Sequence, residues 1–232
     1  MNWIEYWSDH KINDSFWEKN IEHYCTNLPR LTPLSKEFDI LDYGSGPGYA
    51  AKYLSQKVNA FYLIEPSEIL LEKSKRNNNG NPNIVYHLLK DAEDLKDIYG
   101  KDRFDVILVN SVMQYIPPAR IQILLNIFYH MLKPDGKVVI SDIVPKHSLL
   151  IQDVLPSLRF CRKTGMLLAF LKFSTAEIKK LTMRSRLKFW TYSKNELEKL
   201  FSVGYTIRWA DNPTVLSNRM CAVLSKNGAI KP

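Results

Sequence analysis

Short apolar runs alternate with longer segments of helical periodicity through the first two thirds of the chain. Five such runs are Phe38–Tyr43, Asn59–Glu65, Asn83–Leu89, Phe104–Asn110 and Gly136–Ile143. Nearly every position in them is apolar, which is typical of parallel strands that are covered on both faces. The segments between them are long enough to be the crossover helices that parallel strands require. The pattern therefore predicts an α/β fold around a parallel sheet.

Turn signals separate the predicted strands from the predicted helices. Residues 77–83 and 133–136 are rich in Asn, Gly and Pro, and Pro66 is suited to the first turn of a helix. Two more strands follow near the end of the chain, at Thr206–Ala210 and Met220–Ser225. The expected sheet thus has seven strands. The predicted helices are Gly48–Gln56, Pro66–Asn77, Ala92–Lys96, Pro118–Leu132 and, within the segment Ser193–Tyr205, a helix that ends near Gly204.

The sequence DYGSGPGY follows the first predicted strand and indicates a ligand site. In a doubly wound sheet, ligands bind beyond the carboxyl ends of the strands. Gly44, Gly46 and Gly48 lack the Cβ atoms that would keep a ligand away from the backbone. Glu65 ends the second strand and can accept hydrogen bonds from both hydroxyls of a ribose. We therefore expect a ligand that contains a ribose.

Two cofactors fit this pattern, a nicotinamide dinucleotide and S-adenosylmethionine. The dinucleotide fingerprint needs a third glycine for close packing of helix on strand, and Tyr49 occupies that position. S-adenosylmethionine has no pyrophosphate, but it carries an amino group and a sulfonium. Asp42 is a suitable neighbour for such a cation. The residues favour S-adenosylmethionine and leave an NAD-dependent oxidoreductase as the alternative.

Four motifs in order resemble those of the class I S-adenosylmethionine-dependent methyltransferases. They are ILDYGSGPGYAAKYL with Glu65, LKDAEDL, FDVILVNSVMQYI and MLKPDGKVVISDI. The resemblance implies an α/β, Rossmann-like seven-stranded sheet, mostly parallel with one antiparallel strand, with helices on both faces and a helical cap. It also implies that the cofactor lies across the ends of the first four strands. A fainter likeness connects the basic segment and the chain end to methyltransferases of bacterial polysaccharide and glycolipid synthesis.

The resemblance assigns roles to eight residues. Asp42, Gly44, Gly46 and Gly48 would line the methionine end, and Glu65 would bind the ribose. Asp91 would reach the adenine amino group beside the Ala92 backbone, and Asn110 would close over the methionine moiety. Taken alone, Asp91 is equally suited to cap a helix, and Asn110 to end a strand.

Methyl transfer from a sulfonium needs mainly alignment of donor and acceptor, but a hydroxyl acceptor benefits from a general base. His147 lies just after the fifth strand and is the first candidate for this base. Asp142, Gln114 and Tyr115 at the same rim are weaker candidates. The segment NSVMQYIP differs from the NPPY motif of enzymes that methylate amines of nucleic-acid bases. A nucleic-acid substrate is therefore not expected.

The net charge of +8 belongs to one segment. Residues 145–190 contain ten Lys or Arg and two acids, and the rest of the chain is balanced. The segment is interpreted as a solvated basic face, as a cap that binds an anionic acceptor, or as a surface that docks on an anionic membrane. The aromatic residues of 1–34 indicate either core packing or a helical lid. We predict a single domain over 1–232 with both of these additions.

Cysteine and hydropathy patterns exclude several classes of protein. The three cysteines form no CxxC pair, so neither a disulfide framework nor a metal site is indicated. No apolar run is long enough to span a bilayer, and the first residues do not resemble a secretory signal. We expect a cytoplasmic enzyme, membrane-peripheral at most, that methylates a hydroxyl oxygen of a small or glycan-related acceptor, and both a neutral and an anionic acceptor fit this expectation. A non-catalytic docking protein with a methyltransferase-like core is the other alternative.

Overall fold

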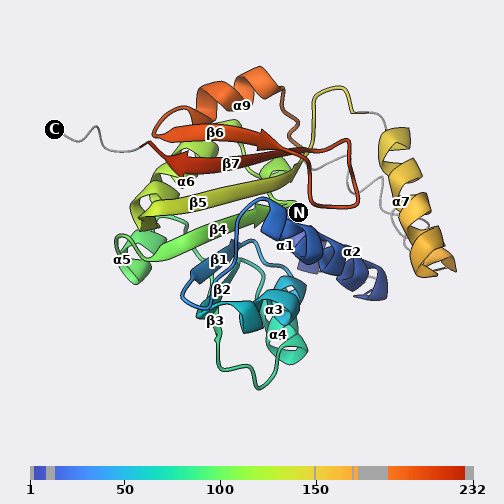
Figure 1. The fold of residues 1–232 in the computed structure, drawn as a ribbon, viewed down its shortest axis with the longest axis horizontal. Coiled ribbons are helices and arrows are strands. Elements are labelled where there is room, and N and C mark those ends of the chain that lie inside the picture. The colour runs from blue at the N-terminus through green and yellow to red at the C-terminus, as the bar shows by residue number, and fades with distance from the viewer. Residues whose placement is uncertain (1–2, 9–13, 149, 169, 172–187, 228–232) are drawn as a thin grey trace.

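The computed structural model describes residues 3–8, 14–148, 150–168, 170–171 and 188–227. Seven strands form one sheet in the order β3-β2-β1-β4-β5-β7-β6 (Figure 1). Strand β7 runs antiparallel to both of its neighbours, and the other pairs are parallel. This confirms the predicted fold class. The strands are β1 (Asp39–Tyr43), β2 (Ala60–Glu65), β3 (Ile84–Leu88), β4 (Phe104–Asn110), β5 (Leu132–Ile143), β6 (Tyr205–Ala210) and β7 (Met220–Lys226).

Helices cover both faces of the sheet and create two hydrophobic cores. Buried residues of α5, α6 and α9 pack on one face, and buried residues of α2 and α3 pack on the other. Central strand residues such as Leu41 and Leu108 are fully buried, as expected for a sheet covered on both faces. The helices are α1 (Trp3–Ser8), α2 (Asp14–Asn27), α3 (Tyr49–Leu54), α4 (Glu68–Asn77), α5 (Leu95–Tyr99), α6 (Pro118–Met131), α7 (Leu150–Thr164) and α9 (Lys194–Phe201).

Strand β5 begins earlier than predicted and contains the expected turn. The segment KPDG at 133–136 lies inside β5, and the register to β4 shifts so that Phe104 pairs with Leu132 while Val106 pairs with Lys137. The chain therefore bulges against β4 instead of turning between helix and strand. The bulge is tight, since a Cβ at Gly136 would lie 2.9 Å from the carbonyl oxygen of Phe104.

Several predicted helix boundaries were wrong, among them those of α4, α5 and α9. Helix α4 starts at Glu68, after Pro66, because the Ser67 side chain caps it by accepting a hydrogen bond from the Leu70 amide. Helix α5 starts at Leu95 and not at Ala92, and α9 ends at Phe201. The predicted first residue of α9, Ser193, is its N-cap and forms a capping box with Glu196.

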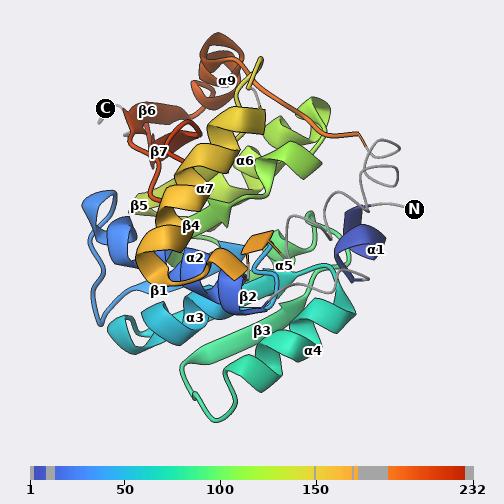
Figure 2. The same cartoon turned by 90° about the vertical axis from the view of Figure 1, so that its right-hand side faces the viewer.

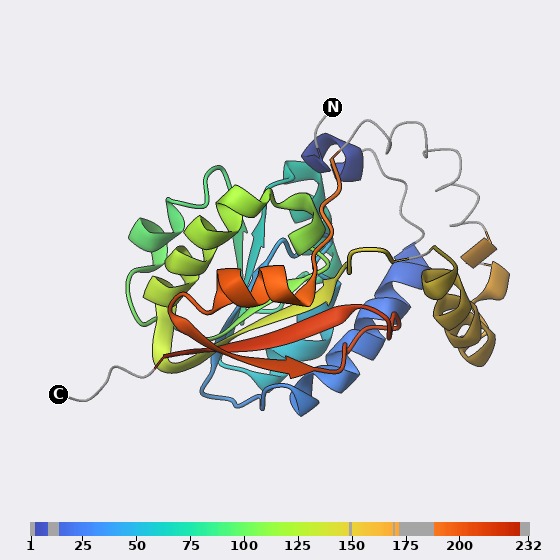
Figure 3. The same ribbon diagram turned by 90° about the horizontal axis from the view of Figure 1, so that it is seen from above.

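Helices α1, α2 and α7 lie at the end of the molecule where the parallel strands finish (Figures 1 and 2). Seen from above, α7 lies beyond α2 and away from the sheet (Figure 3). The side chains of Phe16 and Trp17 on α2 form a small hydrophobic cluster with Cys161, Leu158 and Phe160 of α7. Helix α7 is the first part of the predicted basic cap, and residues 172–187 of that cap lie outside the described residues.

Candidate active site

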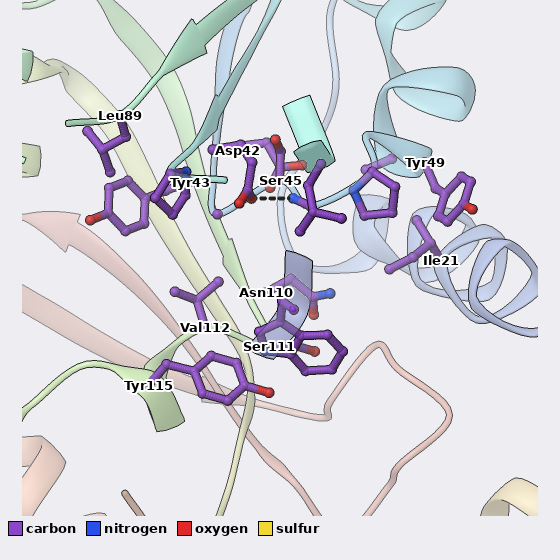
Figure 4. Close-up of a pocket in the computed structure, with 18 of the residues that line it drawn as sticks. Ile21, Asp42, Tyr43, Ser45, Tyr49, Leu89, Asn110, Ser111, Val112 and Tyr115 are labelled. Atoms are coloured by element: carbon purple, nitrogen blue, oxygen red, sulfur yellow. Dashed lines mark hydrogen bonds between the residues drawn. The ribbon is translucent and has the colours of Figure 1, made fainter. Parts of the chain in front are cut away.

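A cavity of about 280 Å³ lies at the carboxyl ends of β1, β2 and β4 (Figure 4). Three groups of residues surround it: the glycine turn after β1, the loop after β4, and helices α1 and α2. In Figure 4, Asn110, Ser111 and Tyr115 lie across the pocket from Ser45. The main polar lining residues are Asp42, Ser45, Glu65, Asn110 and Ser111, and the main apolar ones are Trp3, Trp7, Trp17, Val112 and Tyr115.

The glycine turn is built so that its backbone faces the cavity. Gly44, Gly46 and Gly48 all have φ between 55° and 74°, a conformation that glycine adopts without penalty. A Cβ at Gly44 would lie 2.7 Å from the Val112 side chain, whereas a Cβ at Gly46 would meet nothing within 4 Å. Gly44 and Gly46 line the cavity, and their predicted contact with the methionine end of the cofactor stays a prediction.

Gly48 has a structural position and does not line the cavity. A Cβ there would lie 1.9 Å from the Ser74 hydroxyl oxygen on α4. The Gly48 carbonyl also accepts a hydrogen bond of 2.9 Å from the Asn78 side chain. The third glycine thus allows α3 and α4 to pack closely, and its predicted contact with the methionine moiety stays a prediction.

Glu65 lines the cavity and joins the glycine turn to the end of β2. Its carboxylate accepts hydrogen bonds from the backbone amides of Gly46, at 2.8 Å, and Ser67, at 2.9 Å. Burial raises the pKa of Glu65, and these two hydrogen bonds oppose that rise. A carboxylate has about four acceptor sites, so two remain for the hydroxyls of a ribose. The geometry fits the predicted ribose contact.

Asp42 is the second buried carboxylate of the cavity. Burial, together with repulsion from Glu65, raises the pKa of Asp42 to about 7. A bound cation would offset both effects, because it would stabilise the ionised form of Asp42. The amino group and sulfonium of S-adenosylmethionine are such cations, so these two residues fit that cofactor.

The remaining predicted cofactor residues divide into two groups. Asn110 lines the cavity, and its side-chain oxygen accepts a hydrogen bond of 2.9 Å from Ser141. Asp91 is exposed and Ala92 is half-buried, and neither lines the cavity. Leu89, two residues earlier, does line it. The adenine contacts of Asp91 and Ala92 therefore stay predictions.

His147, the predicted base, is exposed and is absent from the cavity lining. No Lys, Arg or His occurs among the described residues that line the cavity. Within the same part of the chain, no group of three or more His, Cys, Asp or Glu side chains is arranged to hold a metal ion. Asp42 and Glu65 are thus the charged groups of the described lining.

Aromatic side chains of α1 and α2 close the cavity opposite the sheet. The Trp3 ring lies 4.6 Å from that of Tyr115, and the Trp7 ring lies 5.3 Å from that of Trp17, measured between ring centroids. The sequence showed that the first helices are aromatic but not which rings face a ligand. Ser111 and Val112 were also missed as lining residues, because the path of the loop after β4 has no local signal.

A sheet of this order, with a glycine turn after β1 and a buried acid at the end of β2, defines a class I S-adenosylmethionine-dependent methyltransferase. The chain belongs to the methyltransferase domain family, whose model matches residues 16–204. This family assignment favours S-adenosylmethionine over the dinucleotide alternative.

Individual proteins are also similar to this chain, and the solved structures among them share its fold. Carboxy-S-adenosyl-L-methionine synthase from Hydrogenovibrio crunogenus is 24% identical in an alignment of 159 positions, which covers 64% of this chain and 62% of that relative. Phosphoethanolamine N-methyltransferase 1 from Haemonchus contortus, solved with phosphoethanolamine and S-adenosylhomocysteine, has a TM-score of 0.69 at 14% identity. The match covers 99% of this chain and 48% of that one. A Leishmania major S-adenosylmethionine-dependent methyltransferase has a TM-score of 0.63 at 16% identity, over 95% of this chain and 80% of its own.

Proposed function

We propose that this chain transfers a methyl group from S-adenosylmethionine to a hydroxyl oxygen of a small acceptor. The observation that carries the proposal is the continuity of the cavity. It extends from the acidic residues Asp42 and Glu65, which suit the cofactor, to an aromatic chamber formed by Trp3, Trp7 and Tyr115. A cofactor bound at the first end directs its methyl group toward the second, where an acceptor is held away from water.

The lining of the chamber favours an acceptor with a neutral, ring-shaped body, such as a sugar or a phenol. Aromatic rings supply flat apolar contact area, and the described lining holds no cation that could neutralise a phosphate. An anionic part of a glycan-related acceptor would therefore have to lie outside this described lining. In this proposal residues 1–34 are the lid, because α1 and α2 form one wall of the chamber.

A nitrogen acceptor is the second candidate. The faces of Trp3 and Tyr115 can bind a cationic amine through cation–π attraction. The Haemonchus neighbour is, by its name, an N-methyltransferase of phosphoethanolamine. The two candidates differ in the atom that gains the methyl group, so analysis of the product by mass spectrometry separates them.

Calorimetry with S-adenosylmethionine, S-adenosylhomocysteine and NAD tests the proposed donor. We expect binding of the first two, and we expect Glu65→Ala to weaken both by about 5- to 150-fold, equivalent to about 1–3 kcal/mol of lost hydrogen bonds. Glu68→Ala, an exposed change at the start of α4, is the matched control and should bind as the wild type does. Tight binding of NAD without binding of S-adenosylmethionine would contradict the proposal.

We further propose that helix α7 docks on an anionic membrane. Its exposed side chains include Leu155, at 48% exposure, and the cations Arg159, Arg162 and Lys163. No ion pair joins these three cations to the part of the chain that the structure describes. Leu167, Leu168 and Leu171 follow and are exposed as well. Exposed leucines beside cations suit the boundary between head groups and acyl chains.

Vesicle flotation tests the docking proposal. The wild-type chain should float with vesicles of phosphatidylcholine and phosphatidylglycerol, and not with phosphatidylcholine alone. Changing Arg159, Arg162 and Lys163 together to Glu should reduce the bound fraction about 100-fold, at roughly 1 kcal/mol per cation. Lys101→Glu, on an exposed loop before β4, is the control. Equal flotation of the triple variant would reject the membrane and leave the anionic acceptor as the partner of this surface.

None of the described helices has the length and apolarity needed to cross a bilayer.

A further inference from the structure

Two residues with unusual backbone conformations lie side by side at the ends of β4 and β5. Ser111 has φ of 58° and Asp142 has φ of 59°, in a region that residues other than glycine rarely adopt. They are adjacent because Asn110 pairs with Ser141 in the sheet, and the Ser111 amide donates to the Ser141 carbonyl at 3.1 Å. Each such conformation costs about 1–3 kcal/mol and persists where surrounding structure enforces it, often at functional sites.

The pairing of β5 with β7 contributes to this geometry. Its register shifts between Ile140 and Ile143, so Asp142 lies in a bulge. Bulges redirect a side chain, and they occur frequently beside active sites. The Asp142 amide is held by a hydrogen bond of 3.0 Å to the side-chain oxygen of Asn212. Asn212 in turn donates to the Leu216 carbonyl at 2.8 Å, which fixes the loop before β7.

The side chains of the two residues are joined by a short hydrogen bond. The Ser111 hydroxyl donates to Oδ2 of Asp142 at 2.5 Å, a distance typical of a strong bond to a carboxylate. The other carboxylate oxygen, Oδ1, is buried and has no hydrogen-bond partner. Ser111 also lines the cavity, so its hydroxyl connects the buried carboxylate to the chamber.

The charges around Asp142 leave it able to take up a proton. Burial raises the pKa of Asp142, while Arg219 and the Ser111 hydrogen bond lower it and Asp153 raises it further. Arg219 is engaged with Asp153, to which its Nε donates at 3.2 Å, so its charge is shared. A carboxylate with a raised pKa is a better proton acceptor near neutral pH than an exposed one.

We infer that Ser111 is a catalytic residue and that Asp142 is the positioning residue behind it, together forming a proton relay for the acceptor hydroxyl. The acceptor oxygen keeps the electron pair of its O–H bond and forms the bond to the methyl carbon. Its proton passes to the Ser111 oxygen while the Ser111 proton passes to Oδ2 of Asp142. The sulfur keeps the electron pair of the broken S–CH₃ bond, and Asp142 later releases its proton to water.

The relay explains features that the cofactor site alone does not require. In the proposed function Asp42 and Glu65 hold the cofactor, and neither contact requires strain at Ser111 or a third carboxylate at Asp142. His147 is exposed and outside the lining, whereas Ser111 faces the chamber. The inference rests on the proposed hydroxyl-directed function, because an amine acceptor in its neutral form can be methylated without prior loss of a proton.

The first test needs no acceptor. Infrared difference spectroscopy of the cofactor-free chain should show a carboxyl band that titrates with pH and is missing in Asp142→Asn. In Ser111→Ala this band should titrate at higher pH than in the wild type, because the hydrogen bond to the charged form is lost. A band that titrates identically with and without the Ser111 hydroxyl would overturn the relay.

The second test measures turnover with methyl-labelled S-adenosylmethionine and two probes, phenol and the more acidic 4-nitrophenol. With S-adenosylmethionine saturating at every pH, so that the titration of Asp42 does not limit cofactor binding, Ser111→Ala and Asp142→Asn should reduce kcat/KM for phenol by about 10²- to 10⁴-fold and should lose the acidic limb of its pH profile. The loss should be smaller for 4-nitrophenol, which is already ionised in mildly basic solution. Asp102→Asn is the matched control, since Asp102 also has positive φ, at 54°, but pairs with Lys226 away from the cavity.

Calorimetry, together with the turnover measurements, distinguishes failure of the relay from failure of the proposed hydroxyl-directed function. Both relay variants should bind S-adenosylmethionine within about twofold of the wild type, since neither residue holds the cofactor in this proposal. A wild-type chain that binds the cofactor but methylates neither probe counts against the hydroxyl-directed function, and the relay falls with it. Normal turnover by the wild type with an unchanged pH profile in Asp142→Asn overturns the relay alone.

Discussion

Asp42→Asn will make the cofactor-free chain more stable at pH 8 and will weaken its binding of S-adenosylmethionine at least tenfold. The pKa of Asp42 is about 7 in the folded chain, against 3.8 for an unperturbed aspartate. At a pH between these two pKa values, Asp42 has lost its proton in the unfolded state but keeps it in the folded state. The free energy of unfolding therefore falls as the pH rises from about 4 to about 7, and above pH 7 the full cost is present.

The size of this effect follows from the shift. A shift of about three pH units corresponds to at most about 4 kcal/mol, and asparagine removes the buried charge that causes it. In a chain of this length 1 kcal/mol changes Tm by about 2–4 °C, so the gain at pH 8 should be at most about 8–16 °C. The gain should be nearly gone near pH 4, where Asp42 is protonated in the folded state and about half protonated in the unfolded state. Thermal unfolding of both proteins from pH 4 to pH 8 measures it.

Binding should respond in the opposite direction. In the wild type the affinity for S-adenosylmethionine should increase as the pH rises through about 7, because the cation prefers the ionised carboxylate. Asp42→Asn should remove this dependence. Asp39→Asn is the matched control on the same strand: the Asp39 carboxylate lies 3.3 Å from Arg103 and accepts a 2.8 Å hydrogen bond from Asn59. Its variant should lose stability and keep cofactor affinity. Unchanged Tm and affinity in Asp42→Asn would show that this carboxylate is not the neighbour of the cation.

The sequence predicted those parts of the fold that depend on local pattern. Strands buried on both faces leave continuous apolar runs, so the core of each strand was located correctly. The turn after β1 was predicted because its left-handed residues require glycine, and Glu65 followed from its place at the end of β2. These features need only neighbours along the chain and the general order of a doubly wound sheet.

The missed features depend on contacts between distant segments. The KPDG segment has the composition of a turn, but its pairing with Phe104 makes it a bulge in β5. Ser111 and Asp142 meet because of the register between β4 and β5, about 30 residues apart, and no local pattern marks that register. The rings of Trp3 and Trp7 reach the cavity through the packing of α1, which the sequence could describe only as aromatic.

The second prediction with a large expected effect concerns the glycine turn. Alanine at Gly48 should reduce stability, whereas alanine at Gly46 should reduce cofactor affinity. Gly48→Ala should destabilise the fold by roughly 2–5 kcal/mol, since the new Cβ would lie 1.9 Å from the Ser74 hydroxyl oxygen and the residue would keep a φ of 71°. Gly46→Ala meets nothing within 4 Å, so it should cost only the backbone penalty of about 1–2 kcal/mol. Its methyl group points into open space at the cavity and should reduce cofactor affinity at least tenfold.

Chemical denaturation and calorimetry on the two variants measure both quantities. Replacing Ser74 by Gly in the Gly48→Ala background should restore part of the lost stability, because it removes the clashing hydroxyl and Cβ while leaving the backbone penalty. Folded Gly48→Ala protein, at low temperature, should bind the cofactor nearly as the wild type does. If Gly46→Ala instead lost stability and kept affinity, the turn would serve only to pack α3 on the sheet. The ligand would then have to lie elsewhere along the strand ends.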